Sequence, residues 1–225
     1  DLLCSRNRMI EFCRLYKENG LNVIWGCQAR VTTIDEELLK NLKEVNCKQI
    51  IFGLESGSQR VLSLLKNNAT TVEQNKRAVK LVHDSGILAC GSFMIGSPGE
   101  TEEEIEMTKN FILENDLDGV QVTVTTPFPG TKLWEMCKEK GVIPENIDWT
   151  NFNLNNLTFK LNDIPQKRMN EIHNDFLNVV YEKNPGLDSK TVLKVAIKHP
   201  KKAIKRVLKN PRAVVVILQR MLNLK

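Results

Sequence analysis

Four apolar runs rich in β-branched residues alternate with amphipathic segments of helical spacing, and this alternation constrains the fold more than any other feature. The predicted strands are Asn22–Gly26, Gln49–Leu54, Ile87–Ile95 and Gly119–Thr125. The predicted helices between and after them are Ser5–Asn19, Ile34–Asn46, Thr71–Ser85, Glu102–Asn115 and Lys132–Lys140. Strands separated by helices are typical of a parallel sheet, so we expect an α/β fold.

Three predicted helices begin with a capping box, in which a hydroxyl and a carboxylate or amide three residues later satisfy free backbone amides reciprocally. The three pairs are Thr33 with Glu36, Thr71 with Gln74 and Thr101 with Glu104. Each pair coincides with a predicted helix start, which supports the helix assignments.

The connections that follow the predicted strands carry the unusual residues, whereas the turns that lead into the strands are short. The strand-to-helix connections are Cys27–Arg30, Glu55–Ser58, Gly96–Glu100 and Pro127–Thr131. In barrels and open parallel sheets, ligands bind at the carboxyl ends of the strands. These four loops therefore predict one site on one rim of the sheet.

The pattern changes after about residue 141, so we divide the chain into a partial barrel (residues 1–141), a connecting loop (142–164) and a basic helical region (165–225). A helix is predicted over Pro165–Lys183, and two or three short helices after it. Residues 189–225 hold eleven Lys or Arg and no Asp or Glu, so the rest of the chain carries a net charge of −6 within a total of +5.

Composition excludes several classes of protein. Apolar residues make up 41% and charged residues 26% of the chain, which is typical of a globular protein. No apolar run reaches the roughly 18–20 residues of a membrane span. The six cysteines show no C-x-x-C spacing, so we expect them to be reduced in a cytoplasmic protein. The chain begins at Asp1 rather than Met, which we interpret as a piece of a longer protein.

Three motifs occur in a fixed order along these loops: Gly53-Leu-Glu-Ser-Gly-Ser58, Gly96-Ser-Pro-Gly-Glu-Thr101 and Pro127-Phe-Pro-Gly-Thr131. Together with Gln28-Ala-Arg30 they resemble the radical S-adenosylmethionine (SAM) superfamily, and most closely its branch of cobalamin-binding and tRNA methylthiotransferase-like proteins. The resemblance implies that the family's fold is a partial, TIM-like (β/α)₆ barrel and that this chain supplies its last four strands. It also implies that the Cys-x-x-x-Cys-x-x-Cys loop of the 4Fe–4S cluster is missing here, so that these residues alone would be inactive.

The family's activity, as the resemblance implies it, is reductive cleavage of SAM by a 4Fe–4S cluster for radical chemistry, including methyl transfer where an upstream domain binds cobalamin. The implied partners are a small-molecule substrate, that upstream domain and a reductant protein. Two alternatives stay open: a non-catalytic module that binds SAM or a partner, and an adaptor whose basic tail binds RNA or a membrane.

For the second and third predicted strands, the resemblance implies contacts with SAM. Glu55 is expected to accept hydrogen bonds from the ribose hydroxyls; the alternative is a carboxylate that caps nearby amides. Ser56 is a candidate contact, with a turn or cap role as the alternative. Lys66 is a candidate for the SAM carboxylate, or else a solvated surface lysine. Met94 and Gly96 are expected to lie against the adenine.

The remaining candidates lie on the outer predicted strands. Arg30 offers a planar fork that matches the methionine carboxylate of SAM, or else pairs with Glu55 or Asp35. Val122 and Val124 are expected to contact adenine through their backbone. Glu100 either contacts the ligand or caps the following helix. Residues 127–130 are expected to shape the rim; the alternative is a rigid turn in which Phe128 packs in the core.

Overall fold

The computed structural model describes residues 2–144, 146, 147, 149 and 159–183. The chain divides into two units, residues 1–180 and 181–225. Apart from residues 181–183, the described residues all belong to the first unit. The short helices predicted after residue 189 lie outside the described residues. Among the described helices, none has the length and apolar character needed to cross a membrane.

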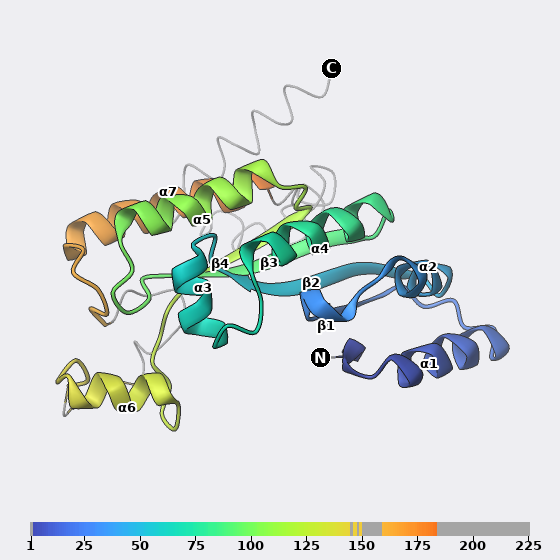
Figure 1. The fold of residues 1–225 in the computed structure, drawn as a ribbon, viewed down its shortest axis with the longest axis horizontal. Coiled ribbons are helices and arrows are strands. Elements are labelled where there is room, and N and C mark those ends of the chain that lie inside the picture. Colours follow the sequence, from blue (N-terminus) through green and yellow to red (C-terminus); the bar gives the residue numbers. More distant parts are fainter. Residues whose placement is uncertain (1, 145, 148, 150–158, 184–225) are drawn as a thin grey trace, which may run out of the picture. The chain divides into compact units, whose positions relative to one another are not determined.

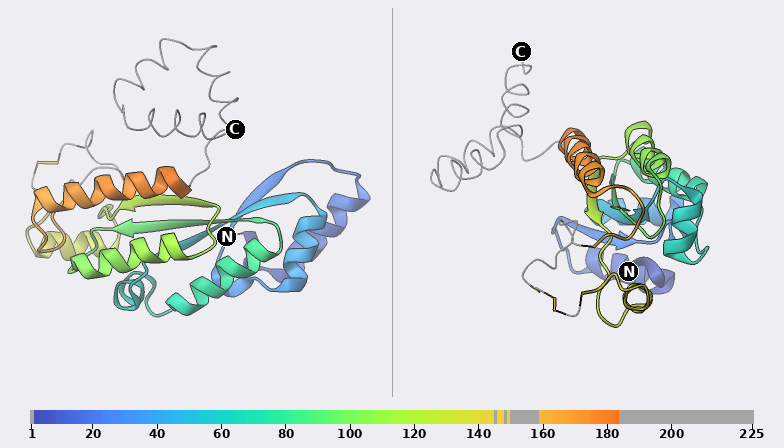
Figure 2. Two further views of the ribbon diagram at one scale, coloured as in Figure 1. Left: turned by 90° about the horizontal axis from the view of Figure 1, so that it is seen from above. Right: turned by 90° about the vertical axis from the view of Figure 1, so that its left-hand side faces the viewer.

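Four strands form one sheet: β1 (Trp25–Ala29), β2 (Cys47–Glu55), β3 (Leu88–Ile95) and β4 (Gly119–Val124). The strands are parallel throughout, and their order in the sheet is their order in the sequence. Each is joined to the next by at least one helix, and α4, α5 and α7 line the same face of the sheet (Figures 1 and 2). The predicted α/β fold with a partial parallel barrel is confirmed.

The described α-helices agree closely with the sequence pattern except at one short helix, and the two 3₁₀ turns were not predicted. The elements are η1 (Leu2–Cys4), α1 (Arg6–Glu18), η2 (Val31–Thr33), α2 (Glu36–Glu44), α3 (Gln59–Lys66), α4 (Val72–Asp84), α5 (Glu102–Glu114), α6 (Lys132–Glu139) and α7 (Gln166–Lys183).

Two of the three capping boxes are confirmed, at Thr71 with Gln74 and at Thr101 with Glu104. The third is wrong, because Asp35 rather than Thr33 caps α2, through its side chain and the amide of Leu38. Thr33 instead ends η2, where its hydroxyl donates to the carbonyl of Arg30. Asp35 lies two residues closer than Thr33 to the apolar residues of α2, and aspartate is among the preferred N-cap residues.

Two further differences concern the start of the first strand and one short helix. β1 begins at Trp25, because the apolar residues before it are exposed and form no ladder. The helix α3 was not predicted at all. It is only eight residues long, and it begins where the hydroxyl of Ser58 accepts from the amide of Val61.

The hydrophobic core lies between the sheet and the helices on its covered face. Alternate residues of β2 (Ile50, Phe52 and Leu54) are fully enclosed, and Phe93 of β3 lies in the same cluster. The helix α7 contributes Phe176, which is 1% exposed. This core fixes the orientation of each strand and therefore decides which residues the opposite face presents.

Candidate functional site

The face of the sheet that the core does not use is called here the inner face. Ile51, Gly53 and Glu55 of β2 are partly exposed on it, alternating with the enclosed residues of the same strand. Successive residues of a strand point to opposite faces, so the ladder places Gln28 of β1 beside Ile51, and Ser92 of β3 beside Gly53. The inner face thus combines apolar and uncharged polar side chains with the carboxylate of Glu55 at the end of β2.

The carboxyl ends of the four strands lie side by side, as the sequence predicted. Ala29 pairs with Phe52 near the end of β2, Glu55 pairs with Phe93, and Ile95 pairs with Val124. A cavity of about 290 Å³ opens on the inner face beside these strand ends. It is lined by Gln28, Ala29, Arg30, Ile51, Gly53, Glu55 and Ser92. Two predicted site residues, Arg30 and Glu55, therefore share one cavity.

Glu55 ends β2 in an unusual backbone conformation. Its φ of +62° lies in the left-handed region that residues with a side chain rarely adopt. The amide of Ser56 donates to the carbonyl of Leu54 at 2.8 Å, which closes a three-residue turn, named here the Glu55 turn (residues 54–56). The β2–β3 register shifts between Gly53 and Glu55. Strain of this kind is found at ligand sites more often than elsewhere.

The Glu55 carboxylate forms an ion pair with Lys66, at 2.7 Å between Oε1 and Nζ. The two side chains are 16% and 33% exposed, and of the pair Glu55 lines the cavity. A Cβ atom on Gly53 would lie 2.6 Å from Glu55 Oε1 and 3.1 Å from Lys66 Nζ. The absence of a side chain at Gly53 therefore leaves the space that the pair occupies.

The residues after the Glu55 turn are held by helix α5. The Ser56 hydroxyl lies 3.1 Å from that of Thr108, which also accepts from the amide of Gly57 at 3.0 Å. Ser56 is fully enclosed. A Cβ atom on Gly57 would collide with the carbonyl of Met107. These contacts are those of a turn residue, the alternative considered for Ser56.

A charged junction joins this loop to the next. Glu104 accepts from the Ser58 hydroxyl at 3.0 Å and from Arg60 Nε at 2.7 Å, and Arg60 also donates to the carbonyl of Gly99 at 2.7 Å. The hydrogen bonds from Arg60, more than any other cause, lower the pKa of Glu104 to about 2. The loops after β2 and β3 are thereby tied together.

The loop after β3 turns at Gly96, whose φ is +78°. A Cβ atom there would lie 3.5 Å from Met169 of α7, so α7 covers this position. Glu100 is 2% exposed, and its Oε2 accepts from the amide of Ser97 at 2.8 Å. Its Oε1 is the one buried side-chain oxygen or nitrogen in the described residues that has no hydrogen-bond partner. Burial raises the pKa of Glu100 to about 7.

The other predicted site residues fall on both faces of the sheet. Met94 is partly exposed opposite Thr123, on the inner face. Val122 and Val124 are 9% and 2% exposed and belong to the helix-covered side, so only their backbone remains to contact a ligand at the rim. Phe128 is 41% exposed, so the alternative in which it packs in the core is wrong.

The two carboxylates considered as partners of Arg30 both pair with other residues. Arg6 pairs with Asp35, and Lys66 pairs with Glu55. The described residues contain no group of three or more His, Cys, Asp or Glu side chains that could hold a metal ion. Five of the six cysteines are buried and Cys4 is exposed; of the buried ones, Cys27 and Cys47 lie against each other. This part of the chain therefore supplies no ligand set for an iron–sulfur cluster.

Three residues that shape the site were given no role in the sequence analysis: Gly53, which appeared only as part of a motif, and Asn75 and Thr108, which were not found. Asn75 and Thr108 are polar residues on the apolar sides of α4 and α5, and both are fully enclosed. A polar residue within an apolar helical stripe was the signal that would have found them, because buried polar groups require partners.

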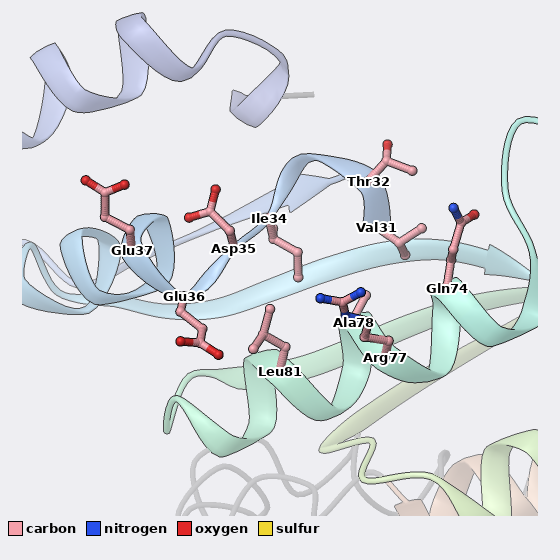
Figure 3. Close-up of a pocket in the computed structure, with 10 residues that line it drawn as sticks. All are labelled: Val31, Thr32, Ile34, Asp35, Glu36, Glu37, Gln74, Arg77, Ala78 and Leu81. Carbon is pink, nitrogen blue, oxygen red and sulfur yellow. The ribbon is translucent and has the colours of Figure 1, made fainter.

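A larger groove, of about 670 Å³, lies between α4 and residues 31–37 (Figure 3). Arg77 and Glu36 are among the side chains in it, whereas none of the predicted site residues lines it. It belongs to the helix layer, because α4 packs on the covered face of the sheet. We therefore place the candidate site at the smaller, inner-face cavity.

The sequence of residues 5–112 matches the family described as the radical SAM superfamily. Two similar proteins are an uncharacterized methyltransferase of Pyrococcus horikoshii and a putative methylthiotransferase of Methanocaldococcus jannaschii. The first is 33% identical over 75% of this chain and 36% of its own length. The second is 38% identical over 59% of this chain and 29% of its own length. The chain thus spans about a third of these relatives.

Solved structures show the same fold. The radical SAM methyltransferase TsrM of Kitasatospora setae, with cobalamin and a [4Fe–4S] cluster bound, matches with a TM-score of 0.53 at 20% identity, over 62% of this chain and 28% of that one. The Escherichia coli coproporphyrinogen III oxidase HemN matches with a TM-score of 0.56 at 12% identity, over 80% of this chain and 41% of that one.

Proposed function

Since this chain belongs to the radical SAM superfamily through residues 5–112, we propose that it binds SAM at the carboxyl ends of its strands, as part of an enzyme that cleaves SAM reductively. The observation that carries the proposal is the Glu55 turn. It places a partly exposed carboxylate beside an inner-face cavity, at the rim where parallel sheets bind ligands.

The residues present fit an adenosyl group. Lys66 contacts Glu55 through Oε1, which leaves Oε2 to accept from a ribose hydroxyl. Met94 supplies an apolar wall, and the backbone around Gly96 and Val124 supplies the polar edge that an adenine needs. Arg30, in the same cavity as Glu55, is the cation we assign to the methionine carboxylate of SAM.

When SAM is bound and a reduced 4Fe–4S cluster is present, the chemistry supplied is the formation of a 5′-deoxyadenosyl radical, which removes hydrogen from a substrate. The described cysteines do not hold that cluster, so the residues of this chain bind and orient the ligand.

We propose methyl transfer to a small molecule as the reaction class. The similarity to a methyltransferase and to a cobalamin-containing structure supports it. A cobalamin domain, a reductant protein and a cytoplasmic location are parts of the same proposal.

Glu55→Gln tests the ribose assignment, because it keeps the shape of the side chain and removes its charge. We expect the affinity of the complete protein for S-adenosylhomocysteine, measured anaerobically by calorimetry, to fall roughly tenfold to a hundredfold, the usual loss for hydrogen bonds to a charged group. Binding of 2′,3′-dideoxyadenosine, which lacks the hydroxyls, should be equally weak in both proteins.

Glu36→Gln, in the groove of Figure 3, is the matched control and should leave the affinity unchanged. An unaltered affinity in Glu55→Gln would remove the ribose assignment. A wild-type protein that binds no S-adenosyl compound, and forms no 5′-deoxyadenosine after reconstitution with iron and sulfide, would remove the proposed function.

A further inference from the structure

We propose that Asn75 is a positioning residue for Glu55: from helix α4 it holds the strained turn that presents the carboxylate to the cavity. The inference rests on the proposed role of Glu55 in binding the ligand. Asn75 itself lines neither cavity and is fully enclosed, so its effect passes through the backbone of the Glu55 turn.

The contacts of Asn75 point directly at this turn. Its Nδ2 donates to the carbonyl of Leu54 at 3.1 Å, and the same carbonyl accepts from the amide of Ser56 at 2.8 Å. Two donors therefore converge on Leu54, one from the turn and one from a helix that starts seventeen residues after Glu55. The carbonyl is held in the orientation that a left-handed residue at position 55 requires.

The amide side chain of Asn75 is itself held in place. Its Oδ1 accepts from the Thr70 hydroxyl at 3.4 Å, and its own backbone amide donates to the carbonyl of Thr71 at the start of α4. The capping box of Thr71 and Gln74 fixes that helix start. Asn75 is thus a rigid donor rather than a side chain that could follow a relaxing turn.

Helix formation alone does not explain this residue. Asparagine is a weak helix former, and burying its amide is costly unless both polar atoms find partners. An apolar residue would extend the stripe formed by Ala78, Val79 and Val82 on the same helix. Placing an amide there gains the contact with Leu54, and that contact acts on the backbone conformation of Glu55.

Asn75→Ala tests the proposal, with Val82→Ala as the matched control. Val82 is equally enclosed and lies on the same helix, but it has no contact with the Glu55 turn in the hydrogen bonds described. We expect Asn75→Ala to lower the affinity of the complete protein for S-adenosylhomocysteine roughly three- to tenfold, the worth of one hydrogen bond. Val82→Ala should lower the unfolding temperature without this loss of affinity.

A double-mutant cycle separates positioning from a general structural effect. In a Glu55→Gln background, Asn75→Ala should cause little further loss of affinity, because the carboxylate that it positions is already gone. An equal loss in both backgrounds would overturn the inference. So would an unchanged affinity in Asn75→Ala, or a loss that Val82→Ala reproduces.

Hydrogen exchange gives a readout that needs no ligand. The amide of Ser56 closes the Glu55 turn, so its exchange should be faster in Asn75→Ala than in the wild type or in Val82→Ala. Unchanged protection of Ser56 would overturn the inference even if affinity falls. If the wild type binds no S-adenosyl compound, the proposed function fails, while the exchange data still decide whether Asn75 holds the turn.

Discussion

At the scale of single residues, Glu100 is the group whose chemistry departs most from its ordinary behaviour. Its carboxyl group is 2% exposed and one oxygen has no partner, so the charged form is disfavoured and the pKa rises to about 7. The amides of Ser97 and Gly96 oppose this effect but do not cancel it. Glu100 therefore acts in folding as a largely neutral group at mildly acidic pH.

A pH-dependent contribution to stability follows from Glu100. The pKa of Glu100 is raised on folding. As pH rises from about 4.5 to about 7, the unfolded state therefore loses this proton while the folded state keeps it, and the free energy of unfolding decreases across that window. The shift corresponds to about 3 kcal/mol. We expect Glu100→Gln to remove this loss, so that denaturant unfolding at pH 5 and pH 8 differs less than in the wild type.

Glu103→Gln, an exposed change on α5 three residues after Glu100, is the control for that experiment. It should leave the dependence of stability on pH between 5 and 8 as it is in the wild type. If Glu100→Gln shows the wild-type dependence, the carboxyl group of Glu100 is ionised in the folded protein at pH 5.

At the scale of elements, the two loops after β2 and β3 behave as one unit because Glu104 and Arg60 join them. Glu104 belongs to the first turn of α5, Arg60 to the first turn of α3, and the carbonyl of Gly99 to the loop after β3. The same carboxylate completes the capping box of Thr101. Loss of this charge therefore affects a helix start and a loop contact together.

The predicted consequence is acid sensitivity. The pKa of Glu104 is lowered to about 2, so its contribution to stability is complete above about pH 4.5 and is lost as pH falls from there towards 2. Glu104→Gln should be less stable than the wild type at pH 7, with a difference that shrinks between pH 4.5 and pH 2. Thermal unfolding across that range measures it, and Glu106→Gln on the exposed side of α5 should show no such trend.

The sequence predicted those features of the elements that depend on residues close together in the chain, and missed those that depend on residues far apart. Strands and long helices were found because periodicity and caps are local, as at Thr71 and Thr101. α3 was missed although α6, which is also eight residues long, was predicted, so its length alone does not explain the omission. The contacts of Asn75 with Leu54 and of Thr108 with Ser56 join residues 21 and 52 positions apart. No local pattern specifies them.

At the scale of the whole molecule, the fold places the hydrophobic core and the proposed ligand site on opposite faces of one sheet. The covered face holds enclosed aliphatic and aromatic residues, and the inner face holds partly exposed and mostly uncharged ones. The candidate residues followed this division only in part. Glu55, Arg30 and Met94 lie at or near the inner face, whereas Val122 and Val124 belong to the covered one.

Neighbouring residues of β3 test this separation, because Ser92 lines the inner-face cavity and Phe93 is fully enclosed on the other side. Phe93→Ala leaves a cavity in the core and should lower the free energy of unfolding by about 3–5 kcal/mol. Ser92→Ala should change it by less than about 1 kcal/mol, since its hydroxyl makes only a long contact, 3.4 Å, with the carbonyl of Phe52. Urea unfolding of the two variants provides the comparison. Similar losses in both would mean that the inner face is packed as a second core, and that a ligand has no place there.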